Sequence, residues 1–388
     1  YFKRGTSYYD TGNHEQAIED LNKTIELYPY LSKSYYFRGV SRSTLENEHA
    51  AIADFTRAIA IKPDIGEYYM QRGTSKSSME HYAEAIRDFD TAIELVPGHS
   101  MAFTNRGIAK YNSGDVQGSL EDLAQSIELE PGNIDVYRAR GDIYFNLNDI
   151  QKSIEDYNKA IEILEASGQA NAQWYLERST IRVETGDYQG ALSDVNTAIG
   201  YDPDSAFAYF KKGLLENVLE EYEQAKADFT QAIELSQDTS ADPYNERGNI
   251  NLRLGDINGA MHDLKKALAI DPDHAEANYT VGFLNTEWEQ YEDALAYLDR
   301  AIQSAPYSFE AYYKRAVAHA ELRHYMEALT DYTRSLELNP DNSSAYLRRG
   351  LLKSRLGDHE GDIADLNRAL EIDPEWAMAY YNRGNSKI

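Results

Sequence analysis

Apolar and small residues recur along this chain at spacings of three and four, with polar residues between them. In the first stretch the small residue Ala17 is followed four positions later by the large residue Leu21, and then by Pro29. Spacings of three and four place side chains on one face of an α-helix, whereas a strand would need alternate positions. The pattern therefore predicts amphipathic helices rather than strands.

The pattern also has a long period. A tyrosine, two variable residues, an arginine and a glycine form a motif, as in residues 35–39. Aligned on the glycine, the chain holds twelve copies, and nine of the eleven intervals are 34 residues. In most copies a small residue follows this anchor by 12 positions, a large apolar residue by 16 and a proline by 24. Such a period indicates one supersecondary unit stacked many times. The anchors are Gly5, Gly39, Gly73, Gly107, Gly141, Ser179, Gly213, Gly248, Gly282, Ala316, Gly350 and Gly384.

Each period is expected to contain two helices. A Gly-Asp pair near its middle supplies a stop for one helix and an N-cap for the next, and the proline ends the second helix. Examples of this pair are Gly186-Asp187, Gly255-Asp256 and Gly357-Asp358. We therefore predict a helix A, a tight turn, a helix B and a short loop in every repeat. The predicted repeats of this single solenoid are residues 1–31, 32–65, 66–99, 100–133, 134–171, 172–205, 206–240, 241–274, 275–308, 309–342, 343–376 and the partial 377–388.

The order aromatic, small, small, large apolar, small and proline at a 34-residue period resembles the tetratricopeptide repeat, and it covers essentially the whole chain. The resemblance implies an all-α fold, a right-handed α-solenoid of antiparallel helix pairs. It implies a scaffold that binds a peptide, a helix or a partner subunit. An alternative is that the array recruits substrates for, or regulates, an enzyme whose catalytic domain lies outside this segment. The chain begins and stops inside predicted helices, so we expect it to be a segment of a longer protein.

Composition narrows the partners. The formal net charge is −27, from 65 acidic and 38 basic residues. A nucleic-acid binder needs a positive field to displace counterions, so we expect protein partners and no DNA or RNA. Acidity likewise disfavours anionic membrane surfaces, and no apolar run approaches the length of a membrane span. Self-association remains open. Cysteine is absent, which removes disulfides and thiolate chemistry but does not identify a compartment.

Two charged positions recur with the period. If the anchor glycine is repeat position 8, position 7 is arginine in ten copies and position 23 is aspartate in ten of eleven. The copy that carries Val281 instead of the arginine also carries Tyr297 instead of the aspartate, so both charges are lost together. We therefore predict a structural ion pair between helices A and B, although a basic row contacting an acidic ligand is the alternative. Representative predicted pairs are Arg38 with Asp54, Arg72 with Asp88, Arg106 with Asp122, and Arg140 with Asp156.

The resemblance also implies where a partner binds. Tetratricopeptide ligands usually lie in a groove lined by the A helices, at repeat positions 5, 9 and 12. Here these positions include an apolar strip that we expect to be exposed and to bind a partner. Its alternative role is packing against the neighbouring A helix. The candidate partner-binding residues are Tyr279, Phe283, Tyr313, Val317, Leu347, Leu351, Phe210 and Leu214.

Residues for catalysis are not recognisable. The sequence shows no phosphate-binding glycine loop, nucleophile elbow or HExxH motif, and the nine histidines are spread along the repeats rather than converging. The lysine and asparagine with which related chaperone adaptors grip a C-terminal carboxylate are also missing from repeat positions 5 and 9 in combination. We expect no enzymatic activity, no catalytic residues, no cofactor and no metal.

Overall fold

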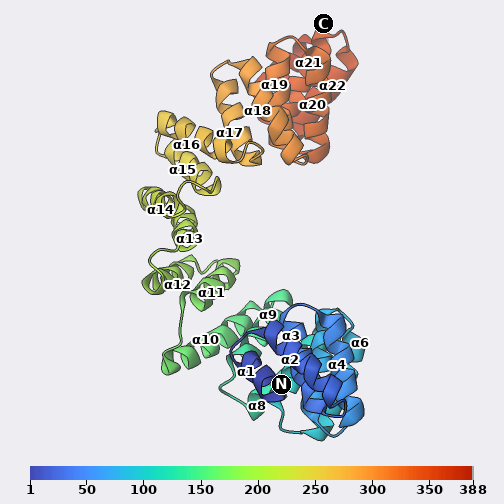
Figure 1. The fold of residues 1–388 in the computed structure, drawn as a ribbon. Coiled ribbons are helices and arrows are strands. Elements are labelled where there is room, and N and C mark those ends of the chain that lie inside the picture. Colours follow the sequence, from blue (N-terminus) through green and yellow to red (C-terminus); the bar gives the residue numbers. More distant parts are fainter. Residues whose placement is uncertain (387–388) are drawn as a thin grey trace. The chain divides into compact units, whose positions relative to one another are not determined.

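The computed structural model describes residues 1–386, which form 23 α-helices and no β-strand. Odd-numbered helices are the A helices of the repeats and even-numbered helices are the B helices (Figure 1). The first eleven are α1 (Phe2–Asp10), α2 (His14–Leu27), α3 (Ser32–Thr44), α4 (Glu48–Ile61), α5 (Gly66–Ser78), α6 (Tyr82–Leu95), α7 (Ser100–Asn112), α8 (Val116–Leu129), α9 (Ile134–Asn146), α10 (Ile150–Ser167) and α11 (Ala172–Glu184).

The remaining twelve helices continue the alternation. They are α12 (Tyr188–Tyr201), α13 (Ala206–Val218), α14 (Tyr222–Leu235), α15 (Asp242–Arg253), α16 (Ile257–Ile270), α17 (Ala275–Glu287), α18 (Tyr291–Ser304), α19 (Phe309–Glu321), α20 (Tyr325–Leu338), α21 (Ser343–Arg355), α22 (His359–Ile372) and α23 (Ala377–Asn385). The prediction of paired helices and of an all-α fold is therefore confirmed.

Contacts between residues divide the chain into two compact units, which meet in sequence between Asp187 and Tyr188. The first unit contains α1 to α11 and the second contains α12 to α23, so each is described by itself. The prediction of one continuous solenoid, with the repeat boundaries given above, stays a prediction.

Where a Gly-Asp pair stands between helices A and B, the turn has the chemistry that the sequence predicts. Gly255 and Gly357 adopt φ of +80° and +85°, in the left-handed region that ends a helix without steric penalty. The next residue then caps the following helix. Asp256 accepts the backbone N–H of Gly259 at 2.9 Å, and Asp358 does the same for the third residue after it. Each pair therefore stops helix A and starts helix B.

Close approach of helices A and B explains the anchor glycine. A Cβ built on Gly73 would lie 2.7 Å from the ring of Phe89, and one built on Gly39 would lie 2.7 Å from the ring of Phe55. Both phenylalanine rings are fully buried. The large residue at the sixteenth position after the anchor thus fills the space that the absent side chain leaves, and the two helices pack at short range.

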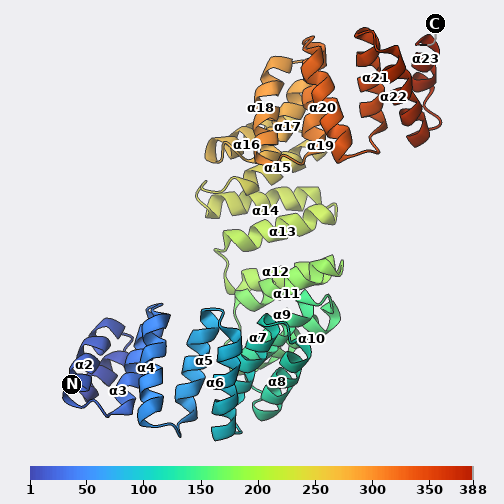
Figure 2. The same ribbon diagram turned by 90° about the vertical axis from the view of Figure 1, so that its right-hand side faces the viewer.

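Successive repeats in each unit stack with their A helices together. Helix α1 contacts α3, and α3 contacts α5; in the second unit α13 contacts α15, and α17 contacts α19. The B helices of successive repeats approach one another less. Figure 2 lets the reader follow the paired helices along each unit. Because the A helices are closer together, they line the inner face of each curved stack.

Candidate protein-binding site

The predicted arginine–aspartate pairs are formed. Arg38 donates from Nε to Asp54 Oδ2 at 2.9 Å and from Nη2 to Asp54 Oδ1 at 2.5 Å. Arg72 holds Asp88 in the same two-pronged way, at 2.9 and 2.6 Å. The aspartates are buried, so the bidentate contact satisfies carboxylates that would otherwise be costly to remove from water. The same geometry joins Arg106 to Asp122 and Arg140 to Asp156.

Most of the motif arginines make further contacts that the sequence reasoning missed. The guanidinium of Arg38 lies 5.6 Å from the ring centre of Tyr35, which explains why tyrosine precedes arginine by three positions in the motif. Its Nη1 reaches back to Asn22 Oδ1 of the preceding repeat at 2.6 Å. Arg106 contacts Asp90 likewise, at 2.6 Å. The sequence does contain a signal for this contact, because a polar residue stands 16 positions before each of these arginines. The arginine row therefore joins successive repeats and is not free to bind a ligand.

A second cation approaches the aspartate in several repeats. It comes from helix A, four positions after the arginine, and its nitrogen lies 2.7 to 2.9 Å from the carboxylate. These contacts join Arg42 to Asp54, Lys76 to Asp88, Lys110 to Asp122 and Lys353 to Asp365. The aspartate in these repeats therefore lies between two positive charges.

The repeat of α13 and α14 reverses this arrangement. Lys212 stands at the arginine position, with its Nζ 2.9 Å from Asp228, but the position of the second cation is Glu216. Lys212 lies 3.5 Å from Glu216, whose side chain is almost wholly buried. One cation thus serves two carboxyl groups. Burial raises the pKa of Glu216 to about 8, and the neighbouring Asp228 adds to the effect.

The repeat of α17 and α18 has no charges at these positions. Val281 is fully buried in a hydrophobic cluster, and Tyr297 packs against the same cluster. An apolar contact replaces the ion pair, which gives the joint loss of arginine and aspartate a physical reason: a lone charge at either place would be buried without a partner.

The candidate strip lies on the A helices of the second unit and is half-buried rather than exposed. Val317 and Leu347 are buried, at 9% and 8% exposure, because A helices pack against one another and against helix B. These two side chains lie beneath the strip and offer little surface to a partner. The other six residues are intermediate in exposure; they are Phe210, Leu214, Tyr279, Phe283, Tyr313 and Leu351.

A lysine partly covers the strip. Lys314 on α19 places its Nζ 4.3 Å from the ring centre of Phe283 on α17, and the same nitrogen contacts Glu287 at 2.8 Å. Tyr279 lies beside Phe283, with ring centres 6.4 Å apart, and burial raises the pKa of its phenol. The structure thus brings four of the predicted residues onto two adjacent A helices: Tyr279 and Phe283 lie on α17, and Tyr313 and Val317 lie on α19. Leu347 and Leu351 lie on the next A helix, α21. Phe210 and Leu214 lie apart from them, on α13.

The comparisons with known proteins agree with this fold. Residues 70–134, 176–246 and 313–375, more than half of the chain, match the tetratricopeptide repeat family. Residues 134–167 and 241–274, residues 1–29 and residues 32–65 match further tetratricopeptide repeats. The chain belongs to the tetratricopeptide repeat family. It is therefore a protein-interaction scaffold, whose stacked helices offer an extended surface to other proteins.

Curated relatives share only part of their length with this chain. DnaJ homolog subfamily C member 3 of Bos taurus is 30% identical over 112 residues, which is 29% of this chain and 22% of that protein. Protein SGT1 homolog of Oryza sativa subsp. japonica is 42% identical over 64 residues, 16% of this chain and 17% of that protein. The matched segment thus spans about a fifth of the length of these relatives.

Solved structures with similar folds include YrrB, described as a tetratricopeptide protein with an unusual peptide-binding site. It is 24% identical with a TM-score of 0.44, and the match covers 49% of this chain and 97% of YrrB. Yeast Tom70 is 15% identical with a TM-score of 0.42, over 100% of this chain and 94% of Tom70. The Cut9–Hcn1 tetramer matches at 15% identity and a TM-score of 0.46, over 98% and 88%.

Two other features bear on the kind of site. Within residues 1–386, none of the helices combines the length and apolar character that crossing a membrane demands. The same residues contain no group of three or more histidine, aspartate or glutamate side chains arranged to hold a metal ion.

Proposed function

We propose that the second unit binds a protein partner on the inner face of its A helices, over Tyr279, Phe283 and Tyr313, with Leu351 at one end. The observation that carries this proposal is the alignment of half-buried aromatic side chains on two adjacent A helices, α17 and α19. Aromatic side chains with part of their surface still in water are typical anchors of protein interfaces.

The chain acts here as a scaffold and not as an enzyme, and it does not bind nucleic acid. The net charge of −27 supports the second statement, because phosphate backbones would be repelled. The side chain of Lys314 covers part of the site, and a partner can displace it. A partner that displaces Lys314 from the face of Phe283 replaces a cation–π contact with apolar burial, whereas the bond from Lys314 to Glu287 can persist.

The test is site-specific photo-crosslinking in native extract. A benzophenone amino acid replaces Phe283 in one variant and Met326 in another. Met326 lies on the B helix α20 and is 64% exposed, so it reports encounters away from the A-helix face. Circular dichroism first confirms that both variants retain the helix content of the unmodified chain.

We expect a discrete cross-linked partner from position 283 that is absent from position 326. The yield at 283 should fall when Tyr313→Ala is added, since a neighbouring anchor is then removed. Equal cross-linking from both positions, or none from 283, would place partner binding elsewhere on the repeats.

A further inference from the structure

A small pocket opens between the last two complete repeats of the second unit, beside the strip. It has a volume of about 110 Å³. Helix α19 contributes Ala320 and Glu321, and α20 contributes two tyrosines. Helix α21 provides two arginines and two leucines. The lining residues are Ala320, Glu321, Tyr325, Tyr332, Arg348, Leu351, Leu352 and Arg355.

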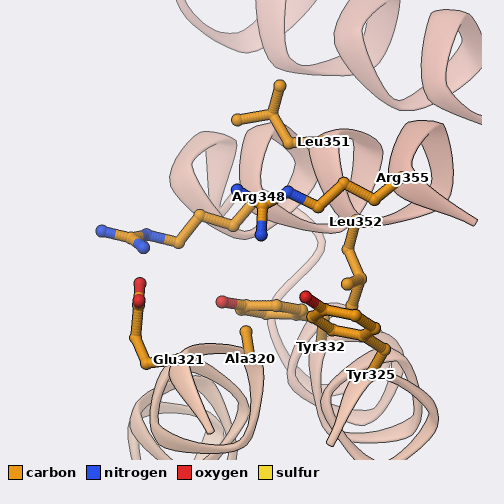
Figure 3. Close-up of a pocket in the computed structure, with 8 residues that line it drawn as sticks. All are labelled: Ala320, Glu321, Tyr325, Tyr332, Arg348, Leu351, Leu352 and Arg355. Atoms are coloured by element: carbon orange, nitrogen blue, oxygen red, sulfur yellow. The ribbon is translucent and has the colours of Figure 1, made fainter. Parts of the chain in front are cut away.

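The two guanidinium groups lie on one side of this pocket. Figure 3 shows both arginines extending from α21; the guanidinium of Arg355 lies above the tyrosine side chains, and that of Arg348 extends past them, with the carboxylate of Glu321 below it. The hydroxyl groups of Tyr313 and Tyr332 lie near Arg348 and interact with it. Cationic and hydroxyl donors therefore converge on the same small space.

These arginines differ from the arginines of the repeat motif. The adjacent Arg349 is bound to Asp365 by two hydrogen bonds, at 2.9 and 2.7 Å. Among the described residues, neither Arg348 nor Arg355 has a carboxylate oxygen within 4.0 Å. Most motif arginines of this acidic chain are ion-paired inside the fold, whereas these two guanidinium groups contact no carboxylate among the described residues and can therefore bind a negatively charged group from outside.

Size and charge restrict that group. A water molecule occupies about 30 Å³ and drug-sized ligands need several hundred, so 110 Å³ fits one amino-acid side chain. The lining carries two positive charges and one negative charge, from Glu321, which leaves one net positive charge. This matches a single carboxylate better than a doubly charged phosphate. The leucines and Ala320 suit the methylene groups of such a side chain.

We propose that this pocket binds the carboxylate of an internal glutamate or aspartate side chain of an extended peptide, held by Arg348 and Arg355. The inference rests on the proposed function, because the pocket continues the strip at Leu351, and it adds the chemistry of one partner residue. The guanidinium groups donate to the carboxylate oxygens, and the hydroxyl of Tyr332 is a further donor. Burial raises the pKa of Tyr332, so this hydroxyl keeps its proton.

The probe is an array of fluorescein-labelled 12-residue peptides, each with tyrosine and leucine around one glutamate, paired with a twin that carries glutamine. Binding of the full chain is measured by fluorescence anisotropy. Variants are Arg348→Gln with Arg355→Gln, Glu321→Gln, and Arg300→Gln as an exposed charge control on the B helix α18. Circular dichroism checks the fold of each variant.

For the tightest peptide, we expect the change from glutamate to glutamine to weaken binding about tenfold or more, the size of a charge-assisted contact. In the double arginine variant this ratio should fall to about one, and Arg300→Gln should leave it unchanged. Glu321→Gln should strengthen binding of the glutamate peptide, because it removes the one repelling charge.

The proposal fails if no peptide of the array binds, if the glutamate and glutamine twins bind equally, or if their ratio persists in the double arginine variant. A phosphoserine twin that binds more tightly than glutamate would also overturn the assignment to a carboxylate. Failure here is distinguishable from failure of the proposed function. If cross-linking from position 283 persists while the peptides show no preference for glutamate, only the carboxylate pocket is lost.

Discussion

The buried carboxyl pair of α13 and α14 makes stability depend on pH in a way that one substitution should abolish. Glu216 and Asp228 share one cation, Lys212, where other repeats place two cations around one carboxylate. Asn251 of the next A helix, α15, is polar but uncharged. The pKa of Glu216 rises from an ordinary value of 4.5 to about 8 through burial and the proximity of Asp228. The folded chain therefore keeps a proton that the unfolded chain releases.

The sign and size follow from this difference. Because the folded state binds the proton more tightly, the free energy of unfolding falls as the pH rises from about 4.5 to about 8, by about 1.4 kcal/mol per pH unit. Full stabilisation is present below this window and is lost above it. At pH 7 the accumulated loss is roughly 3 kcal/mol. The glutamine of Glu216→Gln has the shape of the glutamate and an N–H donor toward Asp228, but it cannot ionise. The substitution should therefore abolish this loss of stability with rising pH.

The assay is urea unfolding of the wild type and of Glu216→Gln, followed by circular dichroism at several pH values between 5 and 8.5. Hydrogen exchange of peptides from α13 and α14 reports the same effect locally, since repeats can open separately. Glu223→Gln, an exposed carboxyl on α14, serves as the control. The free energy of unfolding of Glu216→Gln, relative to that of the wild type, should increase steadily as the pH rises to about 8. A constant difference across this range would refute the shared-proton reasoning.

Three further changes test the repeat architecture by urea unfolding. Asp88→Asn should lower the free energy of unfolding by roughly 3 kcal/mol, because Arg72 and Lys76 lose a buried counter-charge; a loss under about 0.5 kcal/mol would show that the pair is solvated. Gly73→Ala should cost about 1–3 kcal/mol, because its Cβ would overlap the buried ring of the large residue at the sixteenth position after it, and a neutral result would mean that helices A and B separate easily. Glu80→Gly should be stabilising by up to about 1 kcal/mol, because Glu80 has a φ of +62°, and a loss of stability would indicate that its side chain makes a compensating contact.

Most of the fold was predictable from the sequence because its determinants are local and repeated. The 34-residue period, the Gly-Asp turns and the small residues along each helix specify helix A, the turn and helix B without long-range information. The Arg38–Asp54 pair was predictable for the same reason: a fixed separation of 16 residues spans one helical hairpin. The contact from Arg38 back to Asn22 was missed, since it depends on how one repeat stacks on the previous one.

The candidate site was predictable only in part. The periodic pattern placed Tyr279, Phe283 and Tyr313 on A helices, but it did not show that Val317 and Leu347 are buried beneath the strip. Nor did it show that Lys314 covers Phe283, because those residues come from different repeats. The exposure of these side chains depends on the distance between neighbouring A helices, and the spacing of residues within one helix does not predict that distance.

The sequence by itself thus determined the helical hairpins, their number and the ion pairs within them. Tertiary structure alone decided which charges are left without a counterpart. Glu216 becomes a buried acid because a single lysine, Lys212, contacts both its carboxyl group and that of Asp228 in the part of the chain that the structure describes. Arg348 and Arg355 become a candidate anion site because α19 and α20 bring two tyrosines and a single carboxylate, Glu321, against the two cations of α21. The physical reason is that an ionisable group's energy depends on every charge and every water-excluding atom around it, and these come from several helices.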